Sequence, residues 1–319
     1  MIIIENYSNK INSNLGLIQN IPKNLLSKLG INFGGEFAQS GVIEVVVLSP
    51  DSPEVLRSKI EEIGGTYENL GFSYGIVKIP INRIGDLAAI PTIQYIEFPK
   101  ELYTSDAQSN RAACVITARN NYSIEGCGVV IGFIDSGIDF THPAFKNEDG
   151  TSRVEYIYNL NENGRVYTNE EINNALRMSD PFSIVNAYDE TGHGTHVAGI
   201  ACAGGNINTD FYGVAPKSSI MMVKCTRGSY AISTNIMRGL RFLLDKSLEL
   251  NKPLVVNISL STNDGAHNGT SLLEQYISTI ASLEKVTIVI AAGNEGDASH
   301  HVGGELKKEN RISINVSDD

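Results

Sequence analysis

After about residue 105 the chain alternates short apolar runs with longer stretches of helical periodicity, and this alternation constrains the fold more than any other feature. Residues 129–134 are apolar apart from one glycine, which is typical of a parallel strand buried on both faces. Three further strands are expected, at 220–224, 254–260 and 286–292. Three helices are expected, at 195–202, 234–249 and 271–283. This alternation predicts an α/β fold in which a parallel sheet carries helices on both faces.

A smaller unit precedes this region. We expect, in chain order, strand 42–48, helix 53–63, strand 72–79, helix 81–89 and strand 93–98. This order indicates a small α+β sandwich of ferredoxin-like character. We divide the chain into an N-terminal extension (1–40), this α+β domain (41–104), the α/β domain (105–298) and a last segment (299–319) in which Ile312, Ile314 and Val316 alternate as in an edge strand.

Composition excludes several kinds of partner. The chain has 36 acidic and 25 basic residues and a formal net charge of -11, whereas nucleic-acid binding depends on basic clusters. No apolar run approaches the length of a membrane span, and the N-terminus has neither the basic start nor the long apolar core of a signal peptide. We therefore expect no nucleic-acid or membrane partner and a cytoplasmic location, in which the four cysteines are free thiols.

Asp135 and His193 have the placement that acid–base chemistry requires. Asp135 ends a buried strand, which is where open α/β sheets place their functional groups. His193 lies between Gly192 and Gly194 at the start of a predicted helix, and these glycines allow the backbone to approach closely. A hydroxyl nucleophile needs a base that is oriented by a buried carboxylate, so we predict that Asp135 orients His193. Taken singly, a helix cap and a core histidine are the simpler interpretations.

Asn294 follows the predicted strand 286–292. Its side-chain amide could donate to a developing oxyanion, and such a donor contributes on the order of 3 kcal/mol. The alternative is a turn-forming Gly-Asn pair at a strand end.

Three segments resemble, in this order, the Asp, His and oxyanion-hole Asn segments of the subtilisin-like serine proteases, or subtilases. They are Ile134–Asp139, Gly192–Gly199 and Ala291–Asn294. The resemblance covers roughly residues 110–296. It implies a subtilisin-like fold, incomplete in this sequence, and hydrolysis of peptide bonds by an Asp-His-Ser triad.

The nucleophile segment of that family is a Gly-Thr-Ser that follows the Asn segment and precedes small residues, and none follows Asn294 before Asp319. The tripeptide Gly269-Thr270-Ser271 comes too early and precedes large apolar residues. Ser271 with Glu274 forms a capping box ahead of an apolar run. We therefore predict that Ser271 is a helix cap, that the chain contains no nucleophile and that it is inactive alone. A second chain that supplies the serine remains an alternative.

Within the family, the chain is most similar to the bacterial spore-germination subtilases, which retain an inhibitor-like propeptide and insert a β-domain before the serine segment. The resemblance implies that residues 41–104 are a propeptide whose C-terminal part, 97–105, lies in the active-site cleft. It also implies a protein or peptide substrate, an association with the spore, and a β-domain that begins within 299–319. The alternatives are a docking module at 41–104, and a non-catalytic homologue that acts as a sensor or scaffold.

Two segments are expected to contact an extended substrate. Ser259-Leu260-Ser261 resembles the Ser-Leu-Gly segment that lines the first specificity pocket of subtilases, and a serine side chain at Ser261 would narrow that pocket. Across the cleft, Arg227-Gly228-Ser229 is expected to pair its backbone with the substrate by strand addition.

We predict no metal site and no cofactor. His193 and His196 lack the spacing and the glutamate of a zinc-protease helix. Many subtilases bind calcium in the loop after the His helix. The corresponding residues here, Asn206, Asn208 and Asp210, are few and mostly neutral, so calcium stays an open alternative.

Overall fold

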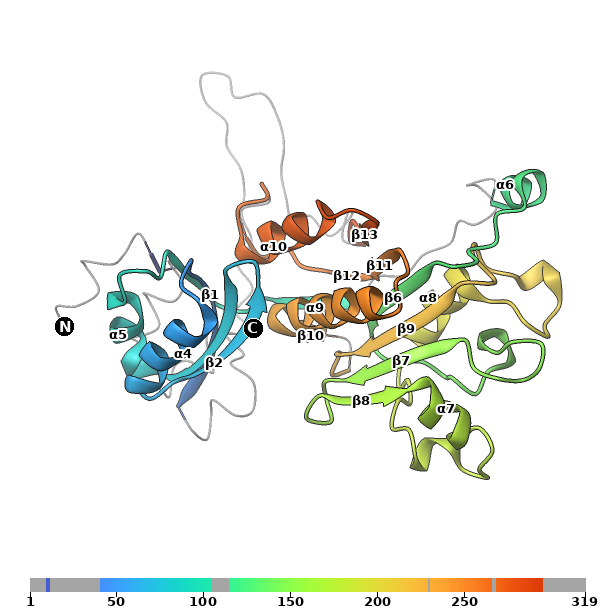
Figure 1. Ribbon diagram of the computed structural model, residues 1–319, viewed down its shortest axis with the longest axis horizontal. Helices are drawn as coiled ribbons and strands as arrows, with labels where there is room; N and C mark the ends of the chain where they lie inside the picture. Colours follow the sequence, from blue (N-terminus) through green and yellow to red (C-terminus); the bar gives the residue numbers. More distant parts are fainter. Residues whose placement is uncertain (1–9, 12–40, 105–114, 229, 266–267, 295–319) are drawn as a thin grey trace, which may run out of the picture.

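The computed structural model describes residues 10–11, 41–104, 115–228, 230–265 and 268–294. The segment 299–319, and the extension 1–40 apart from residues 10–11, lie outside the described residues. Figure 1 shows two units side by side, a small one that contains β1 and β2 and a larger one that contains β6 and β9. In the described part of the chain, no helix is both long and apolar enough to cross a membrane.

The small unit is an antiparallel sheet with strand order β2-β3-β1-β4. Its elements are β1 (Val42–Leu48), α4 (Pro53–Glu62), β2 (Thr66–Gly71), β3 (Tyr74–Pro80), η2 (Ile81–Arg83), α5 (Ile84–Ala89) and β4 (Tyr95–Glu97). Val45 and Val47 of β1 pack with both helices, whereas Val46 between them packs with the large unit. The ferredoxin-like α+β prediction is confirmed, with one strand more than expected.

The additional strand is β2, which the sequence did not indicate because its burial does not alternate. Only Tyr67 and Leu70 are buried in it, since the pairing with β3 is irregular between Asn69 and Gly71. The turn to β3 consists of Phe72 and Ser73, both with positive φ (53° and 70°). Asn and Gly are the usual residues in such two-residue hairpin turns, so this turn carried no signal and was predicted as part of a strand.

The larger unit is a six-stranded sheet with order β13-β11-β6-β9-β7-β8, parallel except for the β7–β8 pair. Its strands are β6 (Val130–Asp135), β7 (Val154–Asn159), β8 (Arg165–Thr168), β9 (Ser219–Lys224), β11 (Leu254–Ile258) and β13 (Val286–Ile290). Its helices are α6 (Val115–Tyr122), η3 (Pro143–Phe145), α7 (Asn169–Ala175), η4 (Pro181–Ser183), α8 (His193–Cys202), η5 (Thr209–Phe211), α9 (Ser233–Glu249) and α10 (Leu272–Ala281).

Helices cover both faces of this sheet, as predicted. In β6, Val130 and Ile134 pack into the core shared with α9 and α10. Ile131 and Phe133 point to the opposite face and pack into the core that contains residues of α7 and α8. Because successive side chains of a strand alternate between faces, a strand covered on both faces is apolar throughout. The apolar run at 129–134 has this cause.

The hairpin β7–β8 was not predicted. β7 has the burial pattern of a strand only partly covered, and its tyrosines and asparagine give no continuous apolar run. The turn uses Asn163 and Gly164, both with positive φ (50° and 75°).

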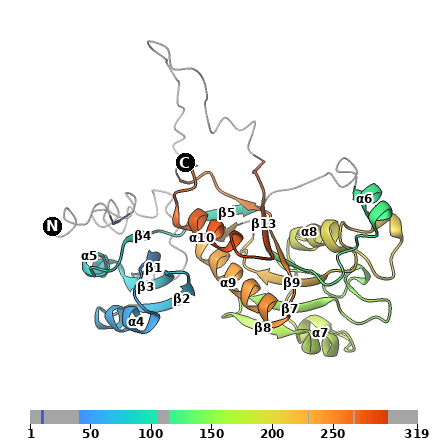
Figure 2. The ribbon, with the colours of Figure 1, turned by 45° about the horizontal axis from the view of Figure 1, so that its top comes forward.

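A third, three-stranded sheet joins the two units. β5 (Glu101–Thr104), which follows the small unit, lies between β10 (Tyr230–Ile232) and β12 (Leu260–Ser261) of the large unit and is antiparallel to both. Figure 2 shows the chain running from β4 in the small unit to β5 beside α10. Strand β5 therefore inserts a segment from outside the large unit between two strands of that unit.

Candidate active site

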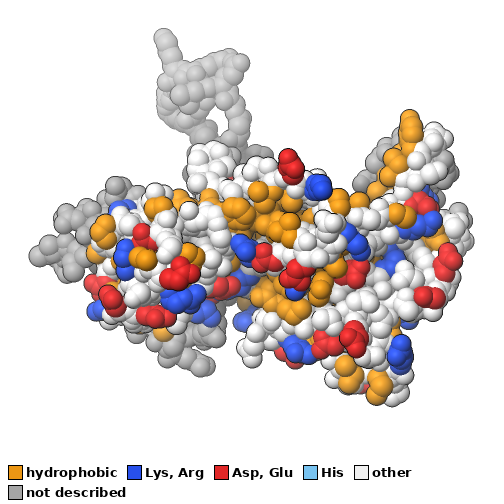
Figure 3. Space-filling view, viewed as in Figure 1, with side chains coloured by type: hydrophobic (Ala, Val, Ile, Leu, Met, Phe, Trp, Pro, Cys, Tyr) orange, Lys and Arg blue, Asp and Glu red, His pale blue; other side chains and the backbone are white. Residues whose placement is uncertain are grey.

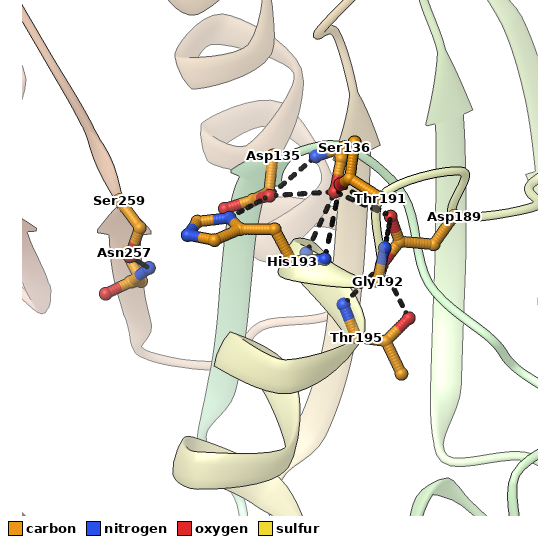
Figure 4. A network of polar contacts seen from close by, with 10 residues as sticks. Asp135, Ser136, Asp189, Thr191, Gly192, His193, Thr195, Asn257 and Ser259 are labelled. Atoms are coloured by element: carbon orange, nitrogen blue, oxygen red, sulfur yellow. Dashed lines mark hydrogen bonds and ion pairs between the residues drawn. The ribbon is translucent and has the colours of Figure 1, made fainter. Parts of the chain in front are cut away.

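Asp135 and His193 form the centre of the site. The Nδ1 atom of His193 lies 2.8 Å from Oδ1 of Asp135, which is completely buried, while His193 is partly exposed. Asp135 ends β6, and His193 is the first residue of α8. Figure 4 shows the imidazole beside Asp135 with its other edge pointing away from the carboxylate. This pair is the interaction that the sequence predicted.

The glycines around His193 permit this approach. Gly192, before the helix, has a left-handed backbone (φ 75°), which favours glycine. A Cβ atom on Gly194 would lie 2.3 Å from the Gly137 carbonyl oxygen and 3.1 Å from Asp135 Oδ1. The start of α8 can therefore pack directly against the end of β6 only when residue 194 has no side chain.

Two further residues, which the sequence analysis missed, complete the network. The backbone N–H of Ser136 donates to Asp135 Oδ1 (2.7 Å), and the Ser136 hydroxyl lies 3.1 Å from the same oxygen. That hydroxyl donates to Oδ1 of Asp189 at 2.7 Å. Asp189 also accepts hydrogen bonds from the first turn of α8. Its only signal in the sequence was an acidic residue just ahead of a predicted helix, which is typical of a helix N-terminus.

Cys225 and the second carboxylate oxygen of Asp135, Oδ2, are buried beside the Asp135–His193 pair. Cys225 follows β9 and donates its backbone N–H to the Asp135 carbonyl at 2.9 Å. Burial, and after it the charge of Asp135, raises the pKa of the Cys225 thiol, so this thiol is neutral at physiological pH. Within the described residues, Asp135 Oδ2 is buried without a hydrogen-bond partner. The side-chain hydrogen bonds between Asp135 and the residues His193 and Ser136 thus all use the same carboxylate oxygen, Oδ1.

Several predicted residues lie at the same carboxyl edge of the sheet. Ser259 follows β11 and accepts a hydrogen bond from Asn257 Nδ2 at 2.8 Å, and both lie across from the His193 ring in Figure 4. Asn294 is exposed and follows β13 after Gly293, whose φ is 95°. The oxyanion role of Asn294 remains a prediction.

Ser271 is the N-cap of α10, and the capping box predicted there is present. Its hydroxyl accepts from the Glu274 backbone N–H at 3.3 Å and donates to Glu274 Oε2 at 2.6 Å. The hydroxyl proton is therefore held by a carboxylate rather than by a histidine.

The expected substrate-contacting segments differ in where they pair. Ser261 and Leu260 are paired with β5, opposite Tyr103 and Thr104. On the other side β5 pairs with Tyr230–Ile232, the residues directly after the predicted Arg227-Gly228-Ser229. Arg227 instead forms an isolated bridge with Tyr230, Gly228 has φ 63°, and Ser229 lies outside the described residues.

The loop after α8 gives no support for a metal ion. The described residues contain no group of three or more His, Cys, Asp or Glu side chains placed to hold one. Asn206 donates to the Glu148 carbonyl at 2.8 Å, and the side chain of Asp210 lies outside the described residues. The buried Arg153 guanidinium donates to the carbonyls of Ala144, Cys202 and Ser218. The Arg153 side chain thus joins the end of α8 to η3 and to the segment before β9.

A buried carboxylate bound to Nδ1 of a histidine, at the carboxyl edge of a parallel sheet, is the arrangement by which triad hydrolases activate a hydroxyl group. Residues 126–319 match the model of the Subtilase family, and the chain belongs to that family. Residues 9–100 match the model described as Csp protease B prodomain, so the small unit is a prodomain of that kind.

Individual relatives agree with this assignment. A solved structure of the Clostridium perfringens CspB protease is 64% identical, covers 63% of this chain and 44% of that chain, and has a TM-score of 0.61. A subtilisin of Bacillus sp. (strain TA39) is 30% identical over 222 residues, which are 68% of this chain and 47% of the relative. Fervidolysin from Fervidobacterium pennivorans shares the fold, with a TM-score of 0.54. It is 19% identical, and the match covers 81% of this chain and 40% of that chain. The chain spans less than half of the length of each of these proteins.

Proposed function

We propose that the protein is a subtilisin-like serine endopeptidase in which Asp135 and His193 are the acid–base half of the triad. The 2.8 Å contact between His193 Nδ1 and Asp135 Oδ1 is the observation that carries the proposal. The carboxylate holds Nδ1 as the protonated nitrogen, which leaves the opposite ring nitrogen to take a proton from a serine hydroxyl as it attacks the peptide carbonyl. The same nitrogen then returns the proton to the leaving amine. Asn294 is the proposed donor to the oxyanion.

The serine is proposed to come from a segment that is not among these 319 residues, since Ser271 acts as a helix cap. The test uses two preparations, this chain alone and the product of the complete coding sequence, each treated with a fluorophosphonate probe. We expect no labelling of this chain. In the complete protein we expect labelling and peptide hydrolysis, both lost in His193→Ala and retained in the matched variant Ser271→Ala. A complete protein that hydrolyses no peptide would favour the non-catalytic homologue, whereas labelling at Ser271 would refute the assignment of the cap.

The prodomain is proposed to occupy the substrate cleft through β5. Its central place between β10 and β12, antiparallel to both, is the geometry in which an extended peptide adds to two open strand edges. On its N-terminal side, Lys100 exchanges hydrogen bonds with Ser233 at 2.6 and 2.7 Å. Adding a synthetic prodomain peptide to a prodomain-deleted protease should inhibit it competitively. Inhibition that is independent of substrate concentration would contradict this placement.

We also propose a role in spore germination, which rests on the resemblance to the spore-germination subtilases; the matches to the Csp protease B prodomain and to the CspB protease agree with that resemblance. Spores that lack the gene should germinate poorly, and the wild-type gene, but not a His193→Ala copy, should restore them. Restoration by His193→Ala would instead favour a scaffold function.

A further inference from the structure

Asp189 is a buried carboxylate without an assigned role, and it is only 8% exposed. Its Oδ1 accepts hydrogen bonds from the Ser136 hydroxyl (2.7 Å), the Gly192 backbone N–H (3.0 Å) and the Thr191 hydroxyl (3.3 Å). Its Oδ2 accepts from the backbone N–H and the hydroxyl of Thr195, both at 2.7 Å. Five donors thus converge on one carboxylate, and all five are neutral.

The first consequence concerns α8. The N-cap residue, Gly192, has no side chain with which to satisfy the free N–H groups at the start of the helix. Asp189 accepts from the backbone on both sides of His193, from Gly192 and from Thr195. A negative charge at this end also complements the helix dipole. Asp189 therefore fixes the turn of backbone that carries the imidazole.

The second consequence concerns the Ser136 hydroxyl. This group has a single proton and two carboxylate oxygens within reach, 2.7 Å away on Asp189 and 3.1 Å away on Asp135. The shorter contact assigns the proton to Asp189, while the hydroxyl oxygen accepts from the Gly194 backbone N–H at 2.9 Å. Asp135 Oδ1 consequently keeps its acceptor capacity for His193. Without Asp189, the hydroxyl would donate to Asp135 Oδ1 and compete with the imidazole.

We propose that Asp189 is the positioning residue of the catalytic base: it fixes the turn of α8 that carries His193 and turns the Ser136 hydroxyl away from Asp135 (Figure 4). This inference rests on the proposed function, since it concerns the residue that would act as the base. Two charged side chains that flank this network in the chain or the sheet pair with each other: Lys224, which ends β9, and Glu190, which follows Asp189. They lie 3.6 Å apart, and Glu190 is mostly exposed.

An amide cannot replace Asp189. Each carboxylate oxygen faces a backbone N–H, from Gly192 and from Thr195, and backbone groups cannot rotate to suit a new partner. Either orientation of an asparagine side chain places its NH₂ group against one of these donors. Asp189→Asn should therefore disturb the site much as Asp189→Ala does, although it preserves the volume.

The test follows His193 by NMR in this chain, where no nucleophile is needed. In Asp189→Ala we expect loss of the downfield signal of the proton between Asp135 and His193. We also expect the pKa of His193 to fall by about one unit relative to the wild-type chain, because a nearby anion that favours the imidazolium is removed. In the Ser136→Ala background, Asp189→Ala should weaken the downfield signal less, because the competing hydroxyl is absent. Asp189→Asn provides the same readouts if the alanine variant does not fold.

Arg153→Met is the matched control, because Arg153 donates to the Cys202 carbonyl at the far end of the same helix. It should lower stability and leave the downfield signal and the pKa of His193 unchanged. If Asp189→Ala behaves like this control, Asp189 is merely structural and the proposal is overturned. In the complete protein, Asp189→Ala should lower kcat about 10-fold or more with KM little changed, since the substrate strands are untouched. If the complete wild-type protein is inactive while the NMR changes occur, the endopeptidase proposal fails and the positioning role stands.

Discussion

Gly194→Ala tests the approach of α8 to β6 most directly. In most helix positions, replacing glycine by alanine stabilises the helix by up to about 1 kcal/mol. Here the new methyl group would lie 2.3 Å from the Gly137 carbonyl oxygen and 3.1 Å from the Gly137 nitrogen. These are backbone atoms that cannot rotate away, so α8 must shift, and such overpacking costs about 1–3 kcal/mol. We expect a net destabilisation of about 1–2 kcal/mol and a longer distance between His193 and Asp135.

The matched control is Gly199→Ala, the same substitution in the same helix. A Cβ atom there would meet no heavy atom within 4 Å, so only the gain in helix propensity remains. Urea denaturation should therefore rank Gly199→Ala as equal to or more stable than the wild type and Gly194→Ala as less stable, with a difference of about 1–3 kcal/mol. The His193 NMR signal should move only in Gly194→Ala. Equal stability of the two variants would refute the close packing of α8 on β6.

Three further outcomes are expected. Ser271→Ala should lower the free energy of unfolding by about 1 kcal/mol through loss of the cap, and a change well below that in denaturation would argue against a capping role. Burial raises the pKa of Glu44. The hydrogen bond and the charge of Arg238 lower it by more than burial raises it, so the net shift is downward from 4.5. The stabilisation from this pair should therefore be complete above about pH 4.5 and lost as the pH falls through the folded-state value; Arg238→Ala should remove that pH dependence from urea denaturation curves. Native protein should react with a thiol reagent at pH 8 at the exposed Cys127 but not at Cys202, whose pKa burial raises to about 11, and peptide mapping that finds Cys202 modified would contradict its burial.

The elements that the sequence predicted are those whose burial is dictated by their own residues. β6, β9, β11 and β13 are short apolar runs, and each was expected within two residues of its observed bounds, except that the strand expected at 254–260 is divided into β11 and β12. β5 and β10 were missed for a different reason. A strand of three or four residues is too short to show a pattern of its own, and β5 meets its neighbours 126 or more residues later in the chain, at Tyr230–Ile232 and Leu260–Ser261.

The site divides in the same way. Asp135 and His193 could be predicted because each lies at the end of an element whose start or stop was evident in the sequence. Asp189 and Ser136 are 53 residues apart, and their hydrogen bond exists only because α8 packs on the end of β6. Their residue types gave no signal specific to this site, since Asp ahead of a helix and Ser after a strand are common at any turn.

The contacts between the two units show that β5 is only one of several attachments of the prodomain. Glu97 accepts from the backbone N–H of Leu272 at the start of α10, and Glu44 contacts Thr234 at the start of α9 and Arg238 one turn further along. Both carboxylates therefore lie where a helix dipole favours negative charge.

Apolar packing adds to these contacts. The ring of Tyr74 packs edge-on against Tyr276 of α10 at 5.1 Å, and the outer face of the prodomain sheet belongs to the same core as α9 and α10. Acidic and basic side chains also lie close together along the boundary between the units in Figure 3. All of these contacts lie before or apart from β5, so cutting the chain after β5 would break none of them. If the chain is cut at this point, we expect the prodomain to stay bound until its charged contacts and its apolar face are displaced together, so that cleavage and release would be separate steps.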